Sequence, residues 1–363
     1  MKGIMKQIFP GEKMKILVTG NMGYVGPSVI RQLRRSYPGA YIMGLDIGYF
    51  AGCSISKEVL PEVILDQQYF ADVRQFPENI LDGVDAVVHL AAISNDPIGN
   101  LFETVTMDIN HSASINVAAK AKKAGVGSFV FASSCSMYGS AEGSARTEDA
   151  PLNPLTAYAR SKVYTERDLR PLAGDGFTVT CLRFATACGM SDRLRLDLVL
   201  NDFVAGAVAS KRISILSDGT PWRPLINVND MARAIDWAVG RQPSVGGDFL
   251  AVNAGFDQGN YQVRELAENV AKIIPGVEVQ INENAQPDQR SYKVNFDLFK
   301  QLAPHHQPVY DLTASITGLH EGLRSMGFMN ENFRSSIYMR LVHLTHLREK
   351  GYLSDDLRWV RPK

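Results

Sequence analysis

Short apolar runs alternate with amphipathic stretches through the first half of the chain. The apolar runs are predicted to be buried strands, and they lie at 15–20, 40–46, 63–73, 85–92, 127–134 and 178–184. The stretches between them, such as 26–37 and 110–125, carry apolar residues at helical spacing. Strands that alternate with helices predict repeated β–α–β units, so we expect an α/β fold with a doubly wound parallel sheet covered on both faces.

The pattern becomes less regular after about residue 185. Helices are expected at 197–210, 229–240, 262–274 and 312–326, and a short strand at 212–216. Two strand-like segments, 225–228 and 248–253, are expected to return to the main sheet. This second region is therefore predicted to form a smaller α/β lobe that is partly intermingled with the first.

These features divide the chain into four parts. Residues 14–185 are predicted to form the first domain and 186–330 the smaller lobe, and a helical tail is expected at 331–363. Residues 1–13 precede the first strand and lack the apolar core of a signal peptide, so we expect a disordered extension there.

Composition narrows the classes of function. The 363 residues are 45% apolar and 21% charged, which is typical of a globular protein. Lys+Arg and Asp+Glu both number 38, and a net charge of zero argues against broad attraction to nucleic acid or membranes. The four cysteines form no CxxC pair, and no apolar run approaches the ~18–20 residues of a membrane span. We therefore expect a cytoplasmic protein with no metal site, no nucleic-acid partner and no membrane segment.

Three glycines, Gly20, Gly23 and Gly26, follow the first strand and open the first helix. Glycine permits a tight turn and a close approach of the backbone to a pyrophosphate, while the helix N-terminus offers free N–H groups. Asp46 ends the next strand, 20 residues after Gly26, where a carboxylate accepts hydrogen bonds from ribose hydroxyls and repels a 2′-phosphate. This spacing predicts a dinucleotide site that prefers NAD to NADP, although a purely structural turn could use the same glycines.

The segment TAYARSK, residues 156–162, places Tyr158 and Lys162 four positions apart. Two residues at this spacing share one face of a helix. Such a pair is either a catalytic acid/base or an ordinary patch of helix surface, and the spacing alone does not decide between them.

Several motifs occur in order along the chain: TGNMGYVG at 19–26, Asp46, ADV at 71–73, HLAA at 89–92, SSCSMYG at 133–139 and YARSK at 158–162. This series resembles the extended short-chain dehydrogenase/reductase family, in particular its NAD-dependent sugar-nucleotide epimerases and dehydratases such as UDP-glucose 4-epimerase. The resemblance covers roughly residues 14–330. It implies a Rossmann-type NAD-binding domain, a nucleotide-diphosphate sugar bound by the smaller lobe, and a homodimer.

The resemblance also implies a catalytic set of Tyr158, Lys162 and Ser134. With the ammonium of Lys162 and an oxidised nicotinamide nearby, the pKa of Tyr158 would fall from its usual ~10, so that the phenolate can take a proton from a sugar hydroxyl. Ser134 would hydrogen-bond the same oxygen. Cofactor contacts are implied at Gly20, Asn21, Met22, Gly23, Tyr24, Val25, Gly26, Asp46, Asp72, Val73, Leu90, Ala91, Ala92, Asn110, Ser133, Tyr158 and Lys162.

Substrate contacts are implied at Ser134, Cys135, Ser136, Thr186, Asn201, Arg223 and Arg290. Arg223, in WRPLINVND, and Arg290, in PDQRSYKVN, are the expected clamps for a diphosphate, because a guanidinium binds phosphate oxygens in a bidentate manner. Either arginine could instead be a surface charge.

One departure from the family pattern bears on the reaction. The 4,6-dehydratases carry an Asp–Glu pair directly after the catalytic threonine, whereas this chain has Cys135 and Ser136 there. Dehydration is therefore less favoured. We expect an NAD-dependent epimerase of a nucleotide-activated sugar that acts through a transient keto intermediate, with a nucleotide-linked keto-sugar reductase as the alternative. A catalytically inactive dinucleotide sensor or scaffold is the third hypothesis, and the intact set of Ser134, Tyr158 and Lys162 argues against it.

Overall fold

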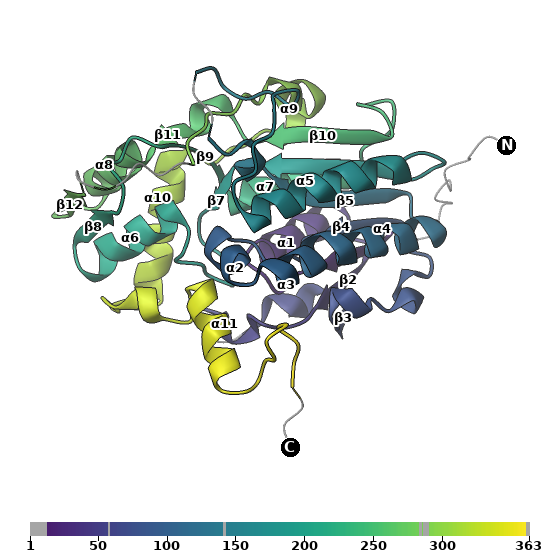
Figure 1. The fold of residues 1–363 in the computed structure, drawn as a ribbon, viewed down its shortest axis with the longest axis horizontal. Helices are drawn as coiled ribbons and strands as arrows, with labels where there is room; N and C mark the ends of the chain where they lie inside the picture. Colours follow the sequence, from purple (N-terminus) through teal and green to yellow (C-terminus); the bar gives the residue numbers. More distant parts are fainter. Residues whose placement is uncertain (1–12, 57–58, 141–142, 283–284, 286–289, 361–363) are drawn as a thin grey trace.

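A seven-stranded parallel sheet forms the centre of the molecule (Figure 1). The computed structural model describes residues 13–56, 59–140, 143–282, 285 and 290–360, so the expected extension at 1–13 lies outside the described residues apart from Lys13. In spatial order, the strands are β10 (Phe249–Ala254), β6 (Thr178–Phe184), β5 (Ser128–Ser134), β4 (Ala86–His89), β1 (Lys15–Thr19), β2 (Tyr41–Asp46) and β3 (Gln67–Phe70). Every pairing in this sheet is parallel, which confirms the predicted doubly wound fold.

The direction in which strands are added reverses between β1 and β4. From β1 the chain moves outward through β2 and β3, and it then crosses back to β4, β5 and β6 on the other side. Connections that leave a parallel sheet in opposite directions open a crevice at the carboxyl ends of the central strands. The topology therefore places a ligand site at the ends of β1 and β4.

Helices cover both faces of the main sheet. α1 (Gly26–Ser36) and α7 (Val228–Val239) pack on one face, and α4 (Ser114–Lys123) and α5 (Ala157–Leu169) pack on the other (Figure 1). Side chains along β1 alternate between these faces: Ile16 and Val18 join the core under α1 and α7, whereas Leu17 joins the opposite core. All three are fully buried, as expected for a strand covered on both sides.

The smaller lobe has a hydrophobic core of its own. Its helices are α6 (Val199–Ala209), α8 (Val263–Ile273) and α10 (Leu312–Ser325). One small sheet contains β7 (Thr186–Cys188), β9 (Trp222–Asn227) and β11 (Asn260–Gln262), and the other contains β8 (Arg212–Ile215) and β12 (Glu278–Ile281).

The structure corrects two of the predicted strands. Segment 248–253 does return to the main sheet as β10, paired with β6. Segment 225–228 does not, because β9 pairs with β7 and β11 and the chain then enters α7 at Val228. The apolar run 63–73 is not one strand, since a 3-10 turn occupies Pro61–Ile64 and only β3 pairs with β2.

The C-terminal segment, defined here as residues 330–360, packs against the first domain, where Figure 1 shows it in yellow. Its only α-helix is α11 (Arg340–Glu349), within the described residues. Leu344, Leu353 and Leu357 are buried in the core on the α4 side of the main sheet. The remaining short helices are α2 (Asp96–Leu101), α3 (Glu103–Met107), a π-helical turn (Asp108–Ala113) and α9 (Asp297–Leu302). In the described part of the chain, no helix has the length and apolar character needed to cross a bilayer.

Candidate active site

A cavity of about 790 Å³ runs along the carboxyl edge of the main sheet and into the smaller lobe. Asp46 and Asp72, at the ends of β2 and β3, border it on one side, and the glycine loop and Tyr158 border it further along. Arg223 lies on the wall that the smaller lobe contributes. One cavity therefore joins the expected cofactor residues to the expected substrate residues.

The glycine loop leaves no room for side chains. Gly20 has a φ of +73°, and a Cβ there would lie 2.5 Å from the backbone nitrogen of Ala91. A Cβ on Gly26 would lie 1.9 Å from the carbonyl oxygen of Asn21. The loop thus presents bare backbone at the mouth of α1, as a dinucleotide pyrophosphate requires. The residues present fit NAD at this position.

Asp46 is held in place by the glycine loop itself. Its carboxylate accepts hydrogen bonds from the backbone N–H groups of Met22, at 3.0 Å, and Gly48, at 2.7 Å. Burial raises the pKa of Asp46, and these two hydrogen bonds oppose that shift. The carboxylate lines the cavity, where ribose hydroxyls are suitable donors to it.

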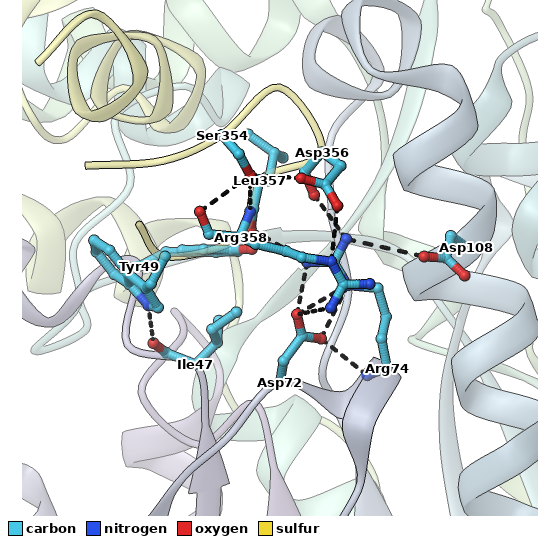
Figure 2. A network of polar contacts seen from close by, with 10 residues as sticks. Ile47, Tyr49, Asp72, Arg74, Asp108, Ser354, Asp356, Leu357 and Arg358 are labelled. Carbon is cyan, nitrogen blue, oxygen red and sulfur yellow. Dashed lines mark hydrogen bonds and ion pairs between the residues drawn. The ribbon is translucent and has the colours of Figure 1, made fainter. Parts of the chain in front are cut away.

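Asp72 also lines the cavity, but its carboxylate is shared with Arg74 (Figure 2). Arg74 donates from Nη2 to Asp72 Oδ2 at 2.6 Å and from Nε to both carboxylate oxygens. Asp72 therefore has less capacity to accept a hydrogen bond from a bound dinucleotide than an unpaired carboxylate would have. Arg74 also donates to the carbonyl oxygens of Asp356 and Leu357, in the C-terminal segment.

Ser134, Tyr158 and Lys162 come together where β5 ends and α5 begins. Ser134 is the last residue of β5, and its hydroxyl is hydrogen-bonded to that of Tyr158. Lys162 lies one turn further along α5, where its Nζ donates to the carbonyl oxygen of Ala132 at 2.6 Å and lies 5.6 Å from the centre of the Tyr158 ring. All three residues line the cavity, so a phenol, a hydroxyl and an amine surround one position.

Burial dominates the pKa shifts in this group when no nicotinamide is present. Burial raises the pKa of Tyr158 to about 12, against the opposing effect of the Ser134 hydrogen bond. Burial lowers the pKa of Lys162 to about 7, against the opposing charge of Glu166. The lowering of the Tyr158 pKa that the resemblance implies requires an oxidised nicotinamide as well as Lys162, so it stays a prediction. A further positive charge beside the phenol, such as that of an oxidised nicotinamide, is needed to lower it.

Replacing Lys162 with methionine should stabilise the protein when NAD has been removed. The folded-state pKa of Lys162, about 7, is below its unfolded value, so the buried ammonium lowers stability below pH 7 and this cost fades as pH rises toward the unfolded pKa. We expect the free energy of unfolding at neutral pH to rise by about 1–3 kcal/mol, and the gain to shrink by pH ~9. Urea denaturation at both pH values checks this, with exposed Lys123→Met as the control. A Lys162→Met protein less stable than the wild type at neutral pH would contradict the account.

Most of the expected cofactor residues line the cavity, namely Gly20, Gly23, Tyr24, Val25, Asp46, Asp72, Val73, Leu90, Ala91, Ala92, Ser133, Tyr158 and Lys162. Asn21, Met22, Gly26 and Asn110 do not line it and act from behind it. The side chain of Asn110, for example, accepts from the N–H of Ile93 and donates to its carbonyl oxygen, both at 2.8 Å. These four residues shape the loops that border the cavity.

Four of the expected substrate residues besides Ser134 also line the cavity: Ser136, Thr186, Arg223 and Arg290. Arg290 forms an ion pair with Asp96, with 2.7 Å between Nη1 and Oδ2. Arg223 donates to the carbonyl oxygen of Arg290, so the two arginines share one stretch of the wall. Two guanidinium groups on one wall suit a diphosphate.

Cys135 and Asn201 do not reach the cavity, and both are corrected to structural positions. Each is fully buried. Cys135 donates from Sγ to the carbonyl oxygen of Arg183 at 3.1 Å, and burial raises its pKa. The amide of Asn201 accepts from the N–H of Gly189 and donates to the carbonyl oxygen of Arg195. Because these polar atoms are occupied away from the cavity, neither side chain is placed to contact a sugar nucleotide.

The structure adds cavity residues that sequence reasoning missed. Arg195 and Asp197 form a buried ion pair with 2.7 Å between Nη2 and Oδ2. The segment RLRLD at 193–197 could have predicted them. Its charged residues alternate with leucines, and charged residues in such an apolar segment are either buried in pairs or line a cavity. The C-terminal segment contributes Arg334, Met339, Arg340 and Leu344. Within the described residues, no group of three or more His, Cys, Asp or Glu side chains is placed to hold a metal ion.

Known proteins resemble this chain along most of its length. The model of the NAD dependent epimerase/dehydratase family matches residues 16–255. UDP-glucose 4-epimerase of Streptomyces lividans is 28% identical over 272 residues, covering 71% of this chain and 80% of that protein. UDP-glucuronic acid decarboxylase 6 of Arabidopsis thaliana is 26% identical over 329 residues, covering 88% and 89%. The structure of MoeE5 in complex with UDP-glucose and NAD has a TM-score of 0.73 at 23% identity, over 86% of this chain and 99% of MoeE5. The two relatives differ in the reaction that their names state.

Proposed function

The chain belongs to the NAD dependent epimerase/dehydratase family, and from that premise we propose that it is an epimerase of a nucleotide-activated sugar. The family and its members that resemble this chain identify it as an NAD-dependent sugar-nucleotide enzyme. The proposal concerns which reaction of the family this chain carries out.

The observation that carries the proposal is the set of side chains around Tyr158. Ser134 and Lys162 accompany the phenol, while the two positions after Ser134 hold Cys135 and Ser136 instead of carboxylates. Epimerisation by oxidation and reduction at one carbon needs a single acid/base. Elimination of water from a neighbouring carbon needs a second one, which these two positions do not supply.

Two other carboxylates on the cavity wall are already engaged. Asp96 accepts from the hydroxyl of Thr156 at 2.6 Å and pairs with Arg290. Asp197 is buried, but its pairing with Arg195 outweighs the burial and lowers its pKa. A carboxylate that is already engaged in an ion pair is a poor general acid, so these groups do not favour a dehydratase.

In the proposed reaction Tyr158 is the acid/base. Its phenolate takes the proton of a sugar hydroxyl, and the hydroxyl of Ser134 donates a hydrogen bond to the same sugar oxygen as a carbonyl forms. NAD, held by the glycine loop and Asp46, would supply the hydride acceptor for that carbon and the hydride donor to the opposite face of the sugar. Tyr158 then returns the proton to the sugar oxygen. Lys162 lies beside the Tyr158 ring and supports the phenol. Arg223 and Arg290 keep the diphosphate bound while the sugar rotates in the site.

The proposal is tested by product analysis. Protein denatured after purification should release NAD(H), identified by absorbance and mass, because an enzyme that regenerates its cofactor has no need to exchange it. Incubation with UDP-, GDP-, CDP- and dTDP-hexoses should give, from at least one of them, a product of unchanged mass and inverted configuration.

Other products would overturn the proposal. Loss of the mass of water would indicate a dehydratase, and loss of the mass of carbon dioxide from a hexuronic acid would indicate a decarboxylase. A gain of two hydrogens that consumes added NAD(P)H would indicate the keto-sugar reductase.

We also propose a homodimer formed through α5 and the helix before it. Tyr164, on α5, is 36% exposed and offers apolar surface for such pairing. Sedimentation equilibrium should give twice the chain mass, and a monomer at assay concentrations would contradict this.

A further inference from the structure

The C-terminal segment forms part of the cavity wall, although the proposed sugar reaction uses none of its residues. It is fixed to the residues that follow β2. Nε2 of His343 lies 2.8 Å from the carbonyl oxygen of Tyr49, and Nε1 of Trp359 donates to the carbonyl oxygen of Ile47 at 2.7 Å. The Tyr49 and Trp359 rings also lie in contact, with 5.8 Å between their centroids.

Figure 2 shows a second attachment, to the residues that follow β3. The guanidinium of Arg358 lies beside the Asp72 carboxylate, with 3.7 Å between Nη1 and Oδ2, and the Tyr49 hydroxyl donates to the carbonyl oxygen of Leu357. Leu357 itself is fully buried. The segment is therefore docked across the adenosine side of the cavity and is not a free tail.

This docking brings Arg340, the first residue of α11, into the cavity wall. Arg340 is only 2% exposed. Its Nη2 donates to the carbonyl oxygen of Arg193 at 2.8 Å, and the guanidinium lies 4.1 Å from the centre of the Phe50 ring. The thiol of Cys53 also lies beside it. Among the described residues, Nη1 of Arg340 has no hydrogen-bond partner.

The charges around Arg340 do not balance. Arg193 is paired with Glu62, with 2.9 Å between nitrogen and oxygen, and Arg195 is paired with Asp197 at 2.7 Å. Within the described part of the chain, no ion pair includes Arg340. Both neighbouring arginines act on it, and Asp197, the carboxylate that also acts on it, is already paired with Arg195. Burial, together with these arginines, lowers its pKa to about 10, so it stays charged at neutral pH. A buried, unpaired cation is costly unless an anion binds to it.

The position of Arg340 indicates which anion this is. Phe50, whose ring the guanidinium covers, lies four residues after Asp46 and lines the ribose end of the cavity. The chain that holds Arg340 through the carbonyl oxygen of Arg193 continues to Arg195, whose Nη1 donates to the hydroxyl of Ser94, beyond the end of β4, at 3.0 Å. A dinucleotide carries its two phosphates between its two nucleosides. The diphosphate of the sugar nucleotide is instead expected at Arg223 and Arg290.

We propose that Arg340, delivered by the docked C-terminal segment, is a ligand of the dinucleotide's phosphates and thereby makes this segment part of the NAD site. A phosphate of bound NAD would supply the ion pair that Arg340 lacks, so the protein should hold NAD more tightly than the glycine loop alone could. The inference requires an NAD site and is independent of the sugar reaction.

The test measures dissociation constants by titration calorimetry on protein freed of nucleotide. The ligands are NAD, ADP, adenosine and UDP. Arg340→Met should raise the dissociation constants of NAD and ADP by about 10- to 100-fold, because a charge-assisted hydrogen bond to phosphate is lost. Adenosine, which has no phosphate, and UDP, which belongs to the other end of the cavity, should bind within about twofold of the wild type.

The matched control is Arg334→Met. Arg334 lies on the same segment and lines the same cavity, but its Nε and Nη2 both donate to Asp202, at 2.9 and 2.7 Å. This variant should keep the wild-type affinity for ADP. Arg340→Lys keeps the positive charge, and it is the variant to use if Arg340→Met fails to fold. It should weaken the binding of ADP by about 5- to 10-fold, because a single amine has to serve both the carbonyl oxygen of Arg193 and the phosphate.

Two results would overturn the proposal. Equal weakening of ADP and adenosine would show that Arg340 only holds the wall in place. Unchanged affinity for NAD and ADP in both Arg340 variants would show that its charge is not used by the dinucleotide.

Discussion

Replacement of Tyr158 by phenylalanine should lower kcat by about 10²- to 10⁴-fold while NAD and the nucleotide sugar still bind. The variant keeps the ring and loses only the hydroxyl that Ser134 hydrogen-bonds. The proton of the sugar hydroxyl then has no phenolate to accept it where β5 ends and α5 begins, because Lys162 is directed to the carbonyl oxygen of Ala132.

The experiment compares turnover with binding in the same preparation. Tyr164→Phe is the matched control, since this tyrosine lies on the same helix and faces outward, and it should keep the wild-type rate. A Tyr158→Phe enzyme that retains more than about a tenth of the wild-type kcat would rule out Tyr158 as the acid/base. The same experiment separates an enzyme from a dinucleotide sensor, because a sensor that only binds the dinucleotide would keep its function without this hydroxyl.

Replacement of Arg183 by methionine should destabilise the fold by about 3–5 kcal/mol, because it leaves the Glu166 carboxylate buried without its cation. Arg183, on β6, and Glu166, on α5, form an ion pair with 2.8 Å between Nη2 and Oε2, and their side chains are only 8% and 7% exposed. Glu166 also accepts from the hydroxyl of Ser133 at 2.5 Å. This network holds the helix that carries Tyr158 and Lys162 against the sheet.

Urea denaturation measures the loss. Arg167→Met, which removes an exposed ion pair with Asp168 on the same helix, should leave the unfolding midpoint unchanged. The double variant Arg183→Met/Glu166→Leu should regain most of the lost stability, because the unpaired charge is removed with its partner. A loss of less than about 1 kcal/mol in Arg183→Met would mean that the pair does not anchor α5.

The parts of the site that could be predicted from sequence depend on local spacing. The glycine loop and Asp46 follow a single β–α–β unit, and the structure places both on one cavity. Tyr158 and Lys162 are four residues apart on one helix, which needs no knowledge of the rest of the fold. The parallel sheet followed from the alternation of strands and helices.

Side-chain direction was harder to predict. Cys135 follows Ser134 directly, yet one side chain enters the core and the other the cavity. Asn201 lies on α6 beside cavity residues such as Asp202 but turns inward to bind backbone groups. Such choices depend on which neighbours satisfy a polar group, and sequence spacing does not contain that information.

The C-terminal segment could not be placed at all from sequence. Its contacts with Tyr49 and Asp72 join residues about three hundred positions apart in the chain. The pKa of Tyr158 before nicotinamide binds also depends on how completely neighbouring elements bury the phenol, which sequence spacing does not contain.

The most direct test of the central claim follows the hydrogen on the carbon that is inverted. A substrate deuterated at that carbon would be incubated with the enzyme in unlabelled water, without added NADH. The account predicts an epimer that keeps its deuterium at the same carbon, because oxidation and reduction occur there within one turnover. Loss of the deuterium to water, or its appearance at another carbon, would contradict it.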